Sequence, residues 1–156
     1  MEAQQEIREK VMQLLARREY SARELSVKLS AKYDPELVEQ VLMQMAERGL
    51  QSDARFAVNL VRGRINQGHG LIRIQSELKQ KGIDQDTIQQ ALEANPVDWF
   101  EQAVATCQRR FGVKRDTDIK TRAKQMRFLQ YRGFTLDQIN HALKFDPADQ
   151  YDPYDP

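Results

Sequence analysis

Residues 77–92 read ELKQKGIDQDTIQQAL, and residues 128–143 repeat their layout as FLQYRGFTLDQINHAL. Each stretch passes from the end of one helix through a glycine, Gly82 or Gly133, into the start of the next helix. Glycine suits the end of a helix because it adopts positive φ angles without a Cβ clash. The shared layout therefore indicates two copies of one helix–glycine–helix element.

A third copy lies upstream, at residues 29–42, which read LSAKYDPELVEQVL. Here Tyr33 stands in place of the glycine, Asp34 can cap the following helix and Pro35 suits its first position. Three related elements in a chain of 156 residues indicate tandem repeats, in which each repeat packs mainly on its neighbours.

Apolar residues at helical spacing around these elements predict three helices in each repeat. No stretch alternates apolar and polar residues with β-branched side chains, so we predict no strand. Helices of this length are marginal alone in water, so packing between neighbouring repeats should complete the core. The sequence thus predicts an all-α protein, an elongated and curved array of three tandem three-helix repeats at residues 3–50, 51–95 and 96–146.

The helix expected between residues 119 and 132 carries few apolar side chains. The positions that we predict to face its core recur at helical spacing: Ile119, Ala123, Met126 and the pair Leu129 and Gln130.

The composition by itself does not indicate a class of binding partner, because the formal net charge of the whole chain is only +1. Residues 147–156 are rich in aspartate and proline and are predicted to form a disordered acidic tail. No run approaches the length of a membrane span and no secretory leader is present. The sequence therefore predicts a cytoplasmic protein without membrane contact.

Few residues could carry chemistry. Cys107 is the only cysteine, which excludes an internal disulfide framework and a multi-cysteine zinc site, and its place on an apolar stripe predicts a buried side chain. His69 stands between two glycines and His141 lies in the last helix, and neither has a second ligand at metal-binding spacing. We therefore expect no catalytic residue, no metal and no cofactor, and interpret the protein as a non-enzyme.

Positive charge is concentrated in two segments. Residues 109–132 contain nine Lys or Arg against two Asp, and residues 53–81 contain six against one Asp and one Glu. Solvated helix faces also carry such charge, but arginine outnumbers lysine in both segments, and its guanidinium suits two-pronged contacts with phosphate or carboxylate. The aromatic residues of the segment at 109–132 are spaced like core residues, so we do not expect base stacking there: Phe111, Phe128 and Tyr131.

Four short motifs follow one another along the chain: GLQSDARFA at residues 49–57, a Gly-x-Gly turn at 68–70, ELKQKGI at 77–83 and YRGF at 131–134. In these motifs the chain resembles the RecX family, regulators of the RecA recombinase. Each motif is weak alone, but their order, spacing and threefold repetition make the match specific over residues 5–145.

The resemblance implies binding to RecA and its filament on single-stranded DNA. We also expect a monomer that makes only weak direct contact with DNA. It implies a regulator, mainly an inhibitor, that limits strand exchange, ATP hydrolysis and co-cleavage of the SOS repressor and has no catalysis of its own. Our hypothesis is that the two basic segments face acidic RecA surface or the filament's DNA. The candidate binding residues are Arg55, Arg62, Arg64, Arg73, Lys79, Lys81, Arg109, Arg110, Lys124 and Arg127.

Two other functions remain open from the residues alone. A free-standing helical DNA-binding protein is the first, because three-helix repeats match helix-turn-helix domains in size and the basic segments could contact phosphate. A helical scaffold for another protein is the second. Affinity for bare DNA that falls steeply with salt would favour the first.

Overall fold

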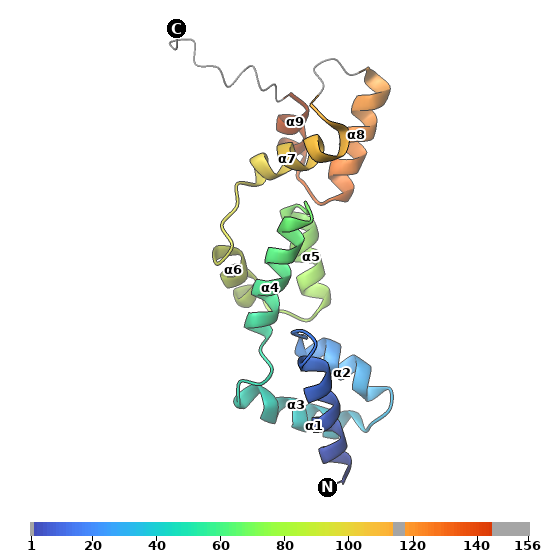
Figure 1. The fold of residues 1–156 in the computed structure, drawn as a ribbon, viewed down its shortest axis with the longest axis vertical. Coiled ribbons are helices and arrows are strands. Elements are labelled where there is room, and N and C mark those ends of the chain that lie inside the picture. The colour runs from blue at the N-terminus through green and yellow to red at the C-terminus, as the bar shows by residue number, and fades with distance from the viewer. Residues whose placement is uncertain (1, 114–117, 145–156) are drawn as a thin grey trace. The chain divides into compact units, whose positions relative to one another are not determined.

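The computed structural model describes residues 2–113 and 118–144, and within these residues the chain forms nine α-helices and no strand (Figure 1). The predicted all-α class is confirmed. The acidic tail predicted at residues 147–156 lies outside the described residues. The helices are α1 (Glu2–Leu15), α2 (Ala22–Ser30), α3 (Pro35–Glu47), α4 (Asp53–Asn66), α5 (Leu71–Gln80), α6 (Gln85–Glu93), α7 (Trp99–Phe111), α8 (Ile119–Tyr131) and α9 (Leu136–Lys144).

Side-chain caps set several helix starts. Ser21 and Glu24 form a capping box at α2, in which the Glu24 N–H donates to Ser21 Oγ (3.1 Å) and the Ser21 N–H to Glu24 Oε1 (3.0 Å). Thr135 and Gln138 exchange the same two bonds before α9, at 3.2 and 2.9 Å. Such caps satisfy backbone N–H groups that have no partner in the first turn of a helix.

The chain divides into two compact units. Unit 1 comprises Met1–Arg62 and Ser76–Asn95, and unit 2 comprises Gly63–Gln75 and Pro96–Pro156.

Unit 1 contains a core in which α1 and α2 both pack on α3. Its buried residues come from the predicted apolar stripes of these helices: Ile7, Val11, Leu25, Leu29, Val38, Val41, Leu42 and Met45. In the same unit, the Asn95 side-chain amide donates to the Val58 and Ala91 carbonyls, at 3.2 and 3.0 Å. The amide therefore ties the end of α6 to α4 within this unit.

Unit 2 contains a core between α7, α8 and α9. Its buried residues are Ala103, Val104, Cys107, Leu129, Phe134, Ile139 and Ala142. Phe111 and Phe128 pack edge to face beside them, with ring centroids 5.4 Å apart. Cys107 is thus a buried residue, as expected, and burial raises the pKa of its thiol.

The predicted inner face of α8 is wrong at Ile119, Met126 and Gln130. Leu129 is fully buried and Ala123 is half-buried, but Ile119 is 89% exposed, and Met126 and Gln130 are exposed as well. Gln125, one turn before Leu129, is buried in their stead. Because α8 has so few apolar residues, a buried glutamine completes its contact face, and periodicity counted on apolar residues alone selects the wrong stripe.

A close backbone contact in unit 2 joins the start of α5 to the turn after α8. The Gly70 N–H donates to the Arg132 carbonyl (2.7 Å) and the Ile72 N–H to the Gly133 carbonyl (3.0 Å), so two N–H groups at the helix start gain partners. A Cβ on Gly70 would overlap the Gly133 carbonyl, and one on Gly133, where φ is +96°, would overlap Arg73. Both positions therefore require glycine, and the contact brings Arg73 against the end of α8.

Candidate basic interface on unit 2

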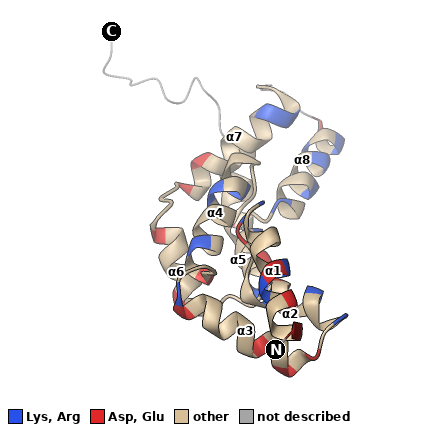
Figure 2. Cartoon of the chain, turned by 60° about the horizontal axis from the view of Figure 1, so that its bottom comes forward, with Lys and Arg blue, Asp and Glu red and all other residues tan. Residues whose placement is uncertain are grey.

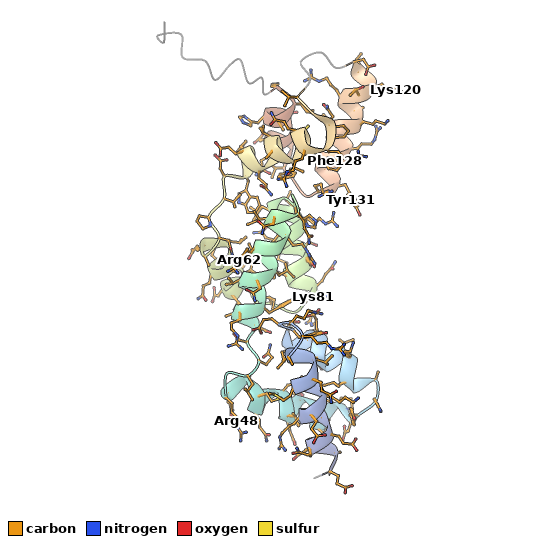
Figure 3. All side chains as sticks on the ribbon, viewed as in Figure 1. Arg48, Arg62, Lys81, Lys120, Phe128 and Tyr131 are labelled. Atoms are coloured by element: carbon orange, nitrogen blue, oxygen red, sulfur yellow. The ribbon has the colours of Figure 1, made fainter. Side chains whose placement is uncertain are left out.

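Helix α8 presents one face that is basic along its length. Lys120, Lys124, Arg127 and Tyr131 follow one another at intervals of four, three and four residues, which places them on one side of a helix, opposite the buried Leu129. All four are exposed. Figure 2 shows the blue of Lys and Arg along α8, and Figure 3 shows Lys120 and Tyr131 at the two ends of this helix.

Tyr131 lies in this exposed stripe and not in the core. Its side chain is 73% exposed, so the interpretation that its spacing marks a core residue is wrong. The Arg73 guanidinium carbon lies 4.7 Å from the Tyr131 ring centroid, and Arg73 Nη1 donates to the Tyr131 carbonyl at 3.3 Å. A cation over an aromatic face is an attractive arrangement, so Arg73 helps to hold the ring at the surface.

A cleft of about 240 Å³ lies between the end of α7 and α8. Arg109 and Arg110 line it from α7, and Phe128 and Arg132 line it from α8 and its cap. The guanidinium carbons of Arg132 and Arg110 lie 4.9 and 6.0 Å from the Phe128 ring centroid. One aromatic ring therefore keeps two cations close together at the mouth of the cleft.

The arginines of the cleft differ in whether their side chains form hydrogen bonds within the protein. Arg132 Nη1 donates to the Gln67 carbonyl at 2.6 Å, which fixes that guanidinium. The side chains of Arg109 and Arg110 are exposed and make no hydrogen bond or ion pair with any residue that the structure describes. Their donors are available to an anionic ligand such as a phosphate or a carboxylate.

Unit 2 holds six of the ten candidate binding residues: Arg64, Arg73, Arg109, Arg110, Lys124 and Arg127. Arg64 is half-buried, and its Nη1 donates to the Gln67 side chain at 3.2 Å. Gln67 lines the cleft and also accepts from Arg132 through its carbonyl, so Arg64 lies beside the cleft. The candidate residues did not include Lys120, Tyr131 and Arg132, which lie on the same helix face or line the same cleft. The spacing of Lys120, Lys124 and Arg127 along one helix face was the signal that could have found the stripe.

Unit 1 holds the other four, and two of them have internal partners. Arg55 Nε forms an ion pair with Glu19 (3.0 Å), and its Nη2 donates to the Gly49 carbonyl (2.8 Å). Lys81 Nζ forms an ion pair with Glu24 at 3.0 Å. Arg62 and Lys79 are exposed.

Glu24 shows how far Lys81 serves the fold. Burial by itself raises the pKa of Glu24, but hydrogen bonds from Ser21, Arg18 and Lys81 outweigh burial and leave the pKa below its ordinary value. The ionised carboxylate thus caps α2 and pairs with Lys81 at the same time.

The described part of the chain offers no arrangement suited to metal chemistry. It contains no cluster of three or more His, Cys, Asp or Glu side chains that could hold a metal ion. His141 packs edge-on against Phe100, with ring centroids 5.5 Å apart, and His69 is buried. Among the described helices, none combines the length and the apolar character that crossing a membrane requires.

Three family models match the chain in tandem. Residues 8–44 match the first three-helix domain of RecX, residues 52–92 the second and residues 97–143 the third. These ranges correspond to α1–α3, α4–α6 and α7–α9, so the predicted tandem of three three-helix repeats is confirmed.

Relatives that align with most of this chain are also named RecX. The chain is 42% identical over 154 residues to the regulatory protein RecX of Halorhodospira halophila, covering 97% of this chain and 96% of that one. It is 43% identical over 138 residues to the regulatory protein RecX of Pseudomonas entomophila, covering 88% and 89%. The crystal structure of RecX from Lactobacillus salivarius has the same fold, with a TM-score of 0.73 at 20% identity over 92% of this chain and 96% of that chain. The chain belongs to the RecX family.

Proposed function

We propose that this protein regulates the RecA recombinase, mainly as an inhibitor, by binding RecA and its filament on single-stranded DNA. Membership of the RecX family along almost the whole chain supports this proposal, because relatives that are 42% and 43% identical to it are named as regulatory proteins. The effect would be to limit strand exchange, ATP hydrolysis and co-cleavage of the SOS repressor. We further propose that the protein acts as a monomer in the cytoplasm, without a cofactor, a metal or catalysis of its own.

The observation that carries the proposed mode of action is the basic surface of unit 2. The α8 stripe and the cleft beside it gather Arg109, Arg110, Lys124 and Arg127, none of which forms an ion pair with another described residue. A surface of this kind favours a polyanionic partner and steers it during association. The acidic surface of RecA and the phosphates of the filament both meet this requirement.

Arg55 and Lys81 contribute less to this surface in our proposal, because each already has an internal carboxylate partner. The surface of unit 2 is therefore the principal contact. The repeat boundaries at residues 3–50, 51–95 and 96–146 remain a prediction within this scheme.

Co-sedimentation with RecA filaments tests the proposal. The wild-type protein should pellet with RecA assembled on single-stranded DNA and remain in solution with the same DNA alone. Equal recovery with bare DNA and with filament would instead support a free-standing DNA-binding protein, and absence from both pellets would contradict the proposed function.

One observation keeps the DNA-binding alternative in view. Tyr131 stands exposed at the end of a stripe of three cations, and exposed aromatic rings beside basic residues can stack on unpaired bases. If direct DNA contact dominates, the affinity should fall steeply as salt increases, because each phosphate contact releases counterions.

A further inference from the structure

Helices α1 and α3 of unit 1 are joined along one face by a ladder of side-chain hydrogen bonds. Gln4 Nε2 donates to Gln40 Oε1 (3.4 Å), and Arg8 Nη2 donates to Gln44 Oε1 (3.3 Å). Both pairs are 36 residues apart in sequence, so the two helices run parallel and each further turn brings the next pair together.

The third pair in this register is Met12 and Arg48, and it cannot close the ladder. A thioether is only a weak hydrogen-bond acceptor. Accordingly, the Arg48 side chain makes no hydrogen bond or ion pair with any described residue. The polar ladder therefore ends in an unpaired guanidinium opposite an apolar side chain.

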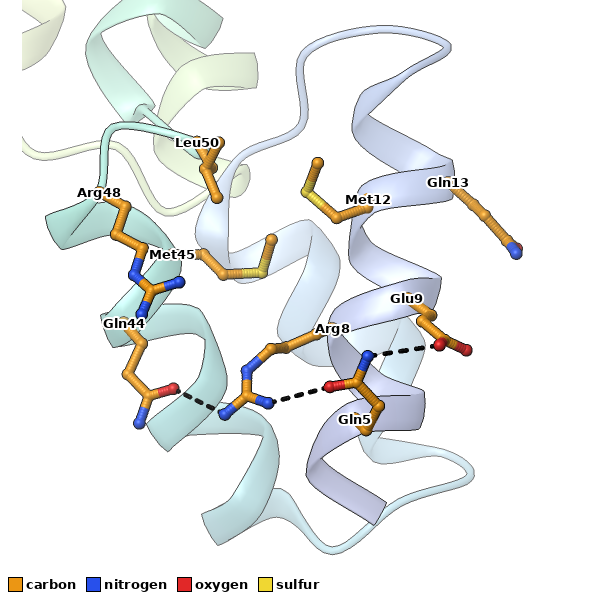
Figure 4. Close-up of a pocket in the computed structure, with 9 residues that line it drawn as sticks. All are labelled: Gln5, Arg8, Glu9, Met12, Gln13, Gln44, Met45, Arg48 and Leu50. Atoms are coloured by element: carbon orange, nitrogen blue, oxygen red, sulfur yellow. Dashed lines mark hydrogen bonds between the residues drawn. The ribbon is translucent and has the colours of Figure 1, made fainter. Parts of the chain in front are cut away.

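A cleft of about 450 Å³ opens at this point (Figure 4). Met12 and Leu50 line it and are 46% and 41% exposed, and the buried Met45 lines it as well. Arg8 and Arg48 stand at its edge, and Glu9 is the only acidic residue among those that line it. The cleft is thus apolar inside and positively charged at the rim, and its volume is in the range of about 300–1,000 Å³ that is usual for binding sites.

We propose that this cleft binds an acidic amphipathic segment of a partner protein. A large apolar side chain of that segment would pack on Met12, Met45 and Leu50, and a neighbouring carboxylate would pair with Arg48. Burial of apolar area favours the first contact, and methionine adapts its shape to different apolar groups. A charge-assisted hydrogen bond to a guanidinium that lacks a partner favours the second.

Charge complementarity selects this occupant over others. The Arg8 side chain donates only to the neutral amides of Gln5 and Gln44. Within the ladder, therefore, no described carboxylate neutralises the positive charge of Arg8 or of Arg48. A basic segment would meet two like charges. A nucleic acid would find two cations but would leave the apolar surface of Met12 and Leu50 exposed to water.

Fluorescence anisotropy with the full chain tests the proposal without RecA, so its failure is separate from failure of the proposed function. The probe is a short fluorescein-labelled helical peptide with leucine at every third or fourth position and glutamate between. Three other labelled probes serve as comparisons. The first is the same peptide with serine in place of leucine, the second has lysine in place of glutamate, and the third is a single-stranded oligonucleotide. Of the four probes, we expect only the leucine–glutamate peptide to bind with a saturable signal.

The substitution Met12→Gln tests the site. It supplies an amide that can accept from Arg48, as Gln44 does from Arg8, and it removes apolar surface from the cleft. Peptide affinity should fall by about tenfold, the factor that loss of one well-packed apolar side chain produces. The matched control is Met43→Gln, an exposed methionine of α3 outside the cleft, which should leave affinity unchanged.

Two further variants complete the test. Met12→Leu keeps the apolar surface and should keep binding, whereas Arg48→Gln should weaken it and reduce its sensitivity to salt. The four variants change three positions, Met12, Met43 and Arg48, all of which are exposed, so circular dichroism should report an unchanged helical content. Failure of the acidic peptide to bind, equal losses for Met12→Gln and Met43→Gln, or equal binding of the lysine peptide or of the oligonucleotide would each overturn the proposal.

Discussion

Arg73 lies over the ring of Tyr131, with its guanidinium carbon 4.7 Å from the ring centroid and a second contact from its Nη1 to the Tyr131 carbonyl. The two residues come from α5 and α8, 58 positions apart in the sequence. The close contact between Gly70 and Gly133 brings them together. A turn that allows no side chain thus positions an exposed aromatic ring at the end of a basic helix face.

Replacing Tyr131 should separate binding from stability. Because the side chain is largely exposed, Tyr131→Ala should change the free energy of unfolding by no more than about 0.5 kcal/mol. It should weaken binding to the RecA filament, because the ring lies within the proposed interface. Thermal unfolding and filament co-sedimentation measure the two effects, and a large loss of stability with normal binding would show that the ring serves only the fold.

Gly133→Ala should destabilise the protein strongly. The backbone at this position has φ of +96°, and a Cβ would overlap Arg73. We expect a loss of more than about 2 kcal/mol, since backbone strain and steric overlap act together. Gly49→Ala is the control, because φ is +73° there but a Cβ would meet nothing within 4 Å, so a loss of only about 1 kcal/mol is expected. Equal losses in urea unfolding would contradict the role assigned to the Gly70–Gly133 contact.

Truncation of a buried leucine should show which side chains form the core. Leu129→Ala should lower the free energy of unfolding by roughly 2–5 kcal/mol, because the side chain is fully buried in unit 2. Leu136→Ala, at an exposed position of α9 in the same unit, should cost less than about 0.5 kcal/mol. Chemical denaturation measures both losses. A larger loss for Leu136→Ala than for Leu129→Ala would contradict the burial of Leu129 and the exposure of Leu136 in the structure.

The fold should lose stability in acid partly through Glu24. Its pKa in the folded protein is below the ordinary value of 4.5, so its contribution is fully present above that pH and is lost as pH falls through the lower folded-state pKa. Glu24→Gln removes the titrating group and should flatten this part of the dependence of unfolding free energy on pH. Urea unfolding at a series of acidic pH values provides the measurement, and an unchanged slope in the variant would exclude Glu24 as a contributor.

Local sequence signals were sufficient for much of the fold. The capping boxes at Ser21 and Thr135 and the positive φ of Gly82 and Gly133 depend on residues within one or two helical turns, so each can be predicted from the sequence alone. The layout shared by residues 29–42, 77–92 and 128–143 predicted three repeats, which the tandem family matches confirm.

The site was less predictable because it depends on contacts between distant residues. Gln125 is buried and Ile119 is exposed because of how α8 packs against its neighbours, which hydrophobicity does not reveal. Likewise, Arg55 and Arg109 both belong to basic segments, yet the carboxylate of Glu19 engages only Arg55. Which charges remain available to a partner could be determined only from the structure.

The central claim is that the protein inhibits RecA through the basic surface of unit 2, and RecA-catalysed ATP hydrolysis on single-stranded DNA tests it most directly. The protein is titrated from far below the RecA concentration to parity, as wild type and as two variants with four charges reversed. One variant carries the reversals to glutamate at Arg109, Arg110, Lys124 and Arg127, and the control carries them at the exposed Lys10, Arg17, Lys28 and Lys32 of unit 1.

We predict that the wild-type and control proteins inhibit hydrolysis, and that the unit 2 variant needs about tenfold more protein or fails while keeping its helical content. Inhibition at far fewer copies than RecA would favour capping of the filament, and inhibition only near parity would favour binding along it. An unchanged rate of hydrolysis with wild-type protein at parity, or equal inhibition by both variants, would contradict the account.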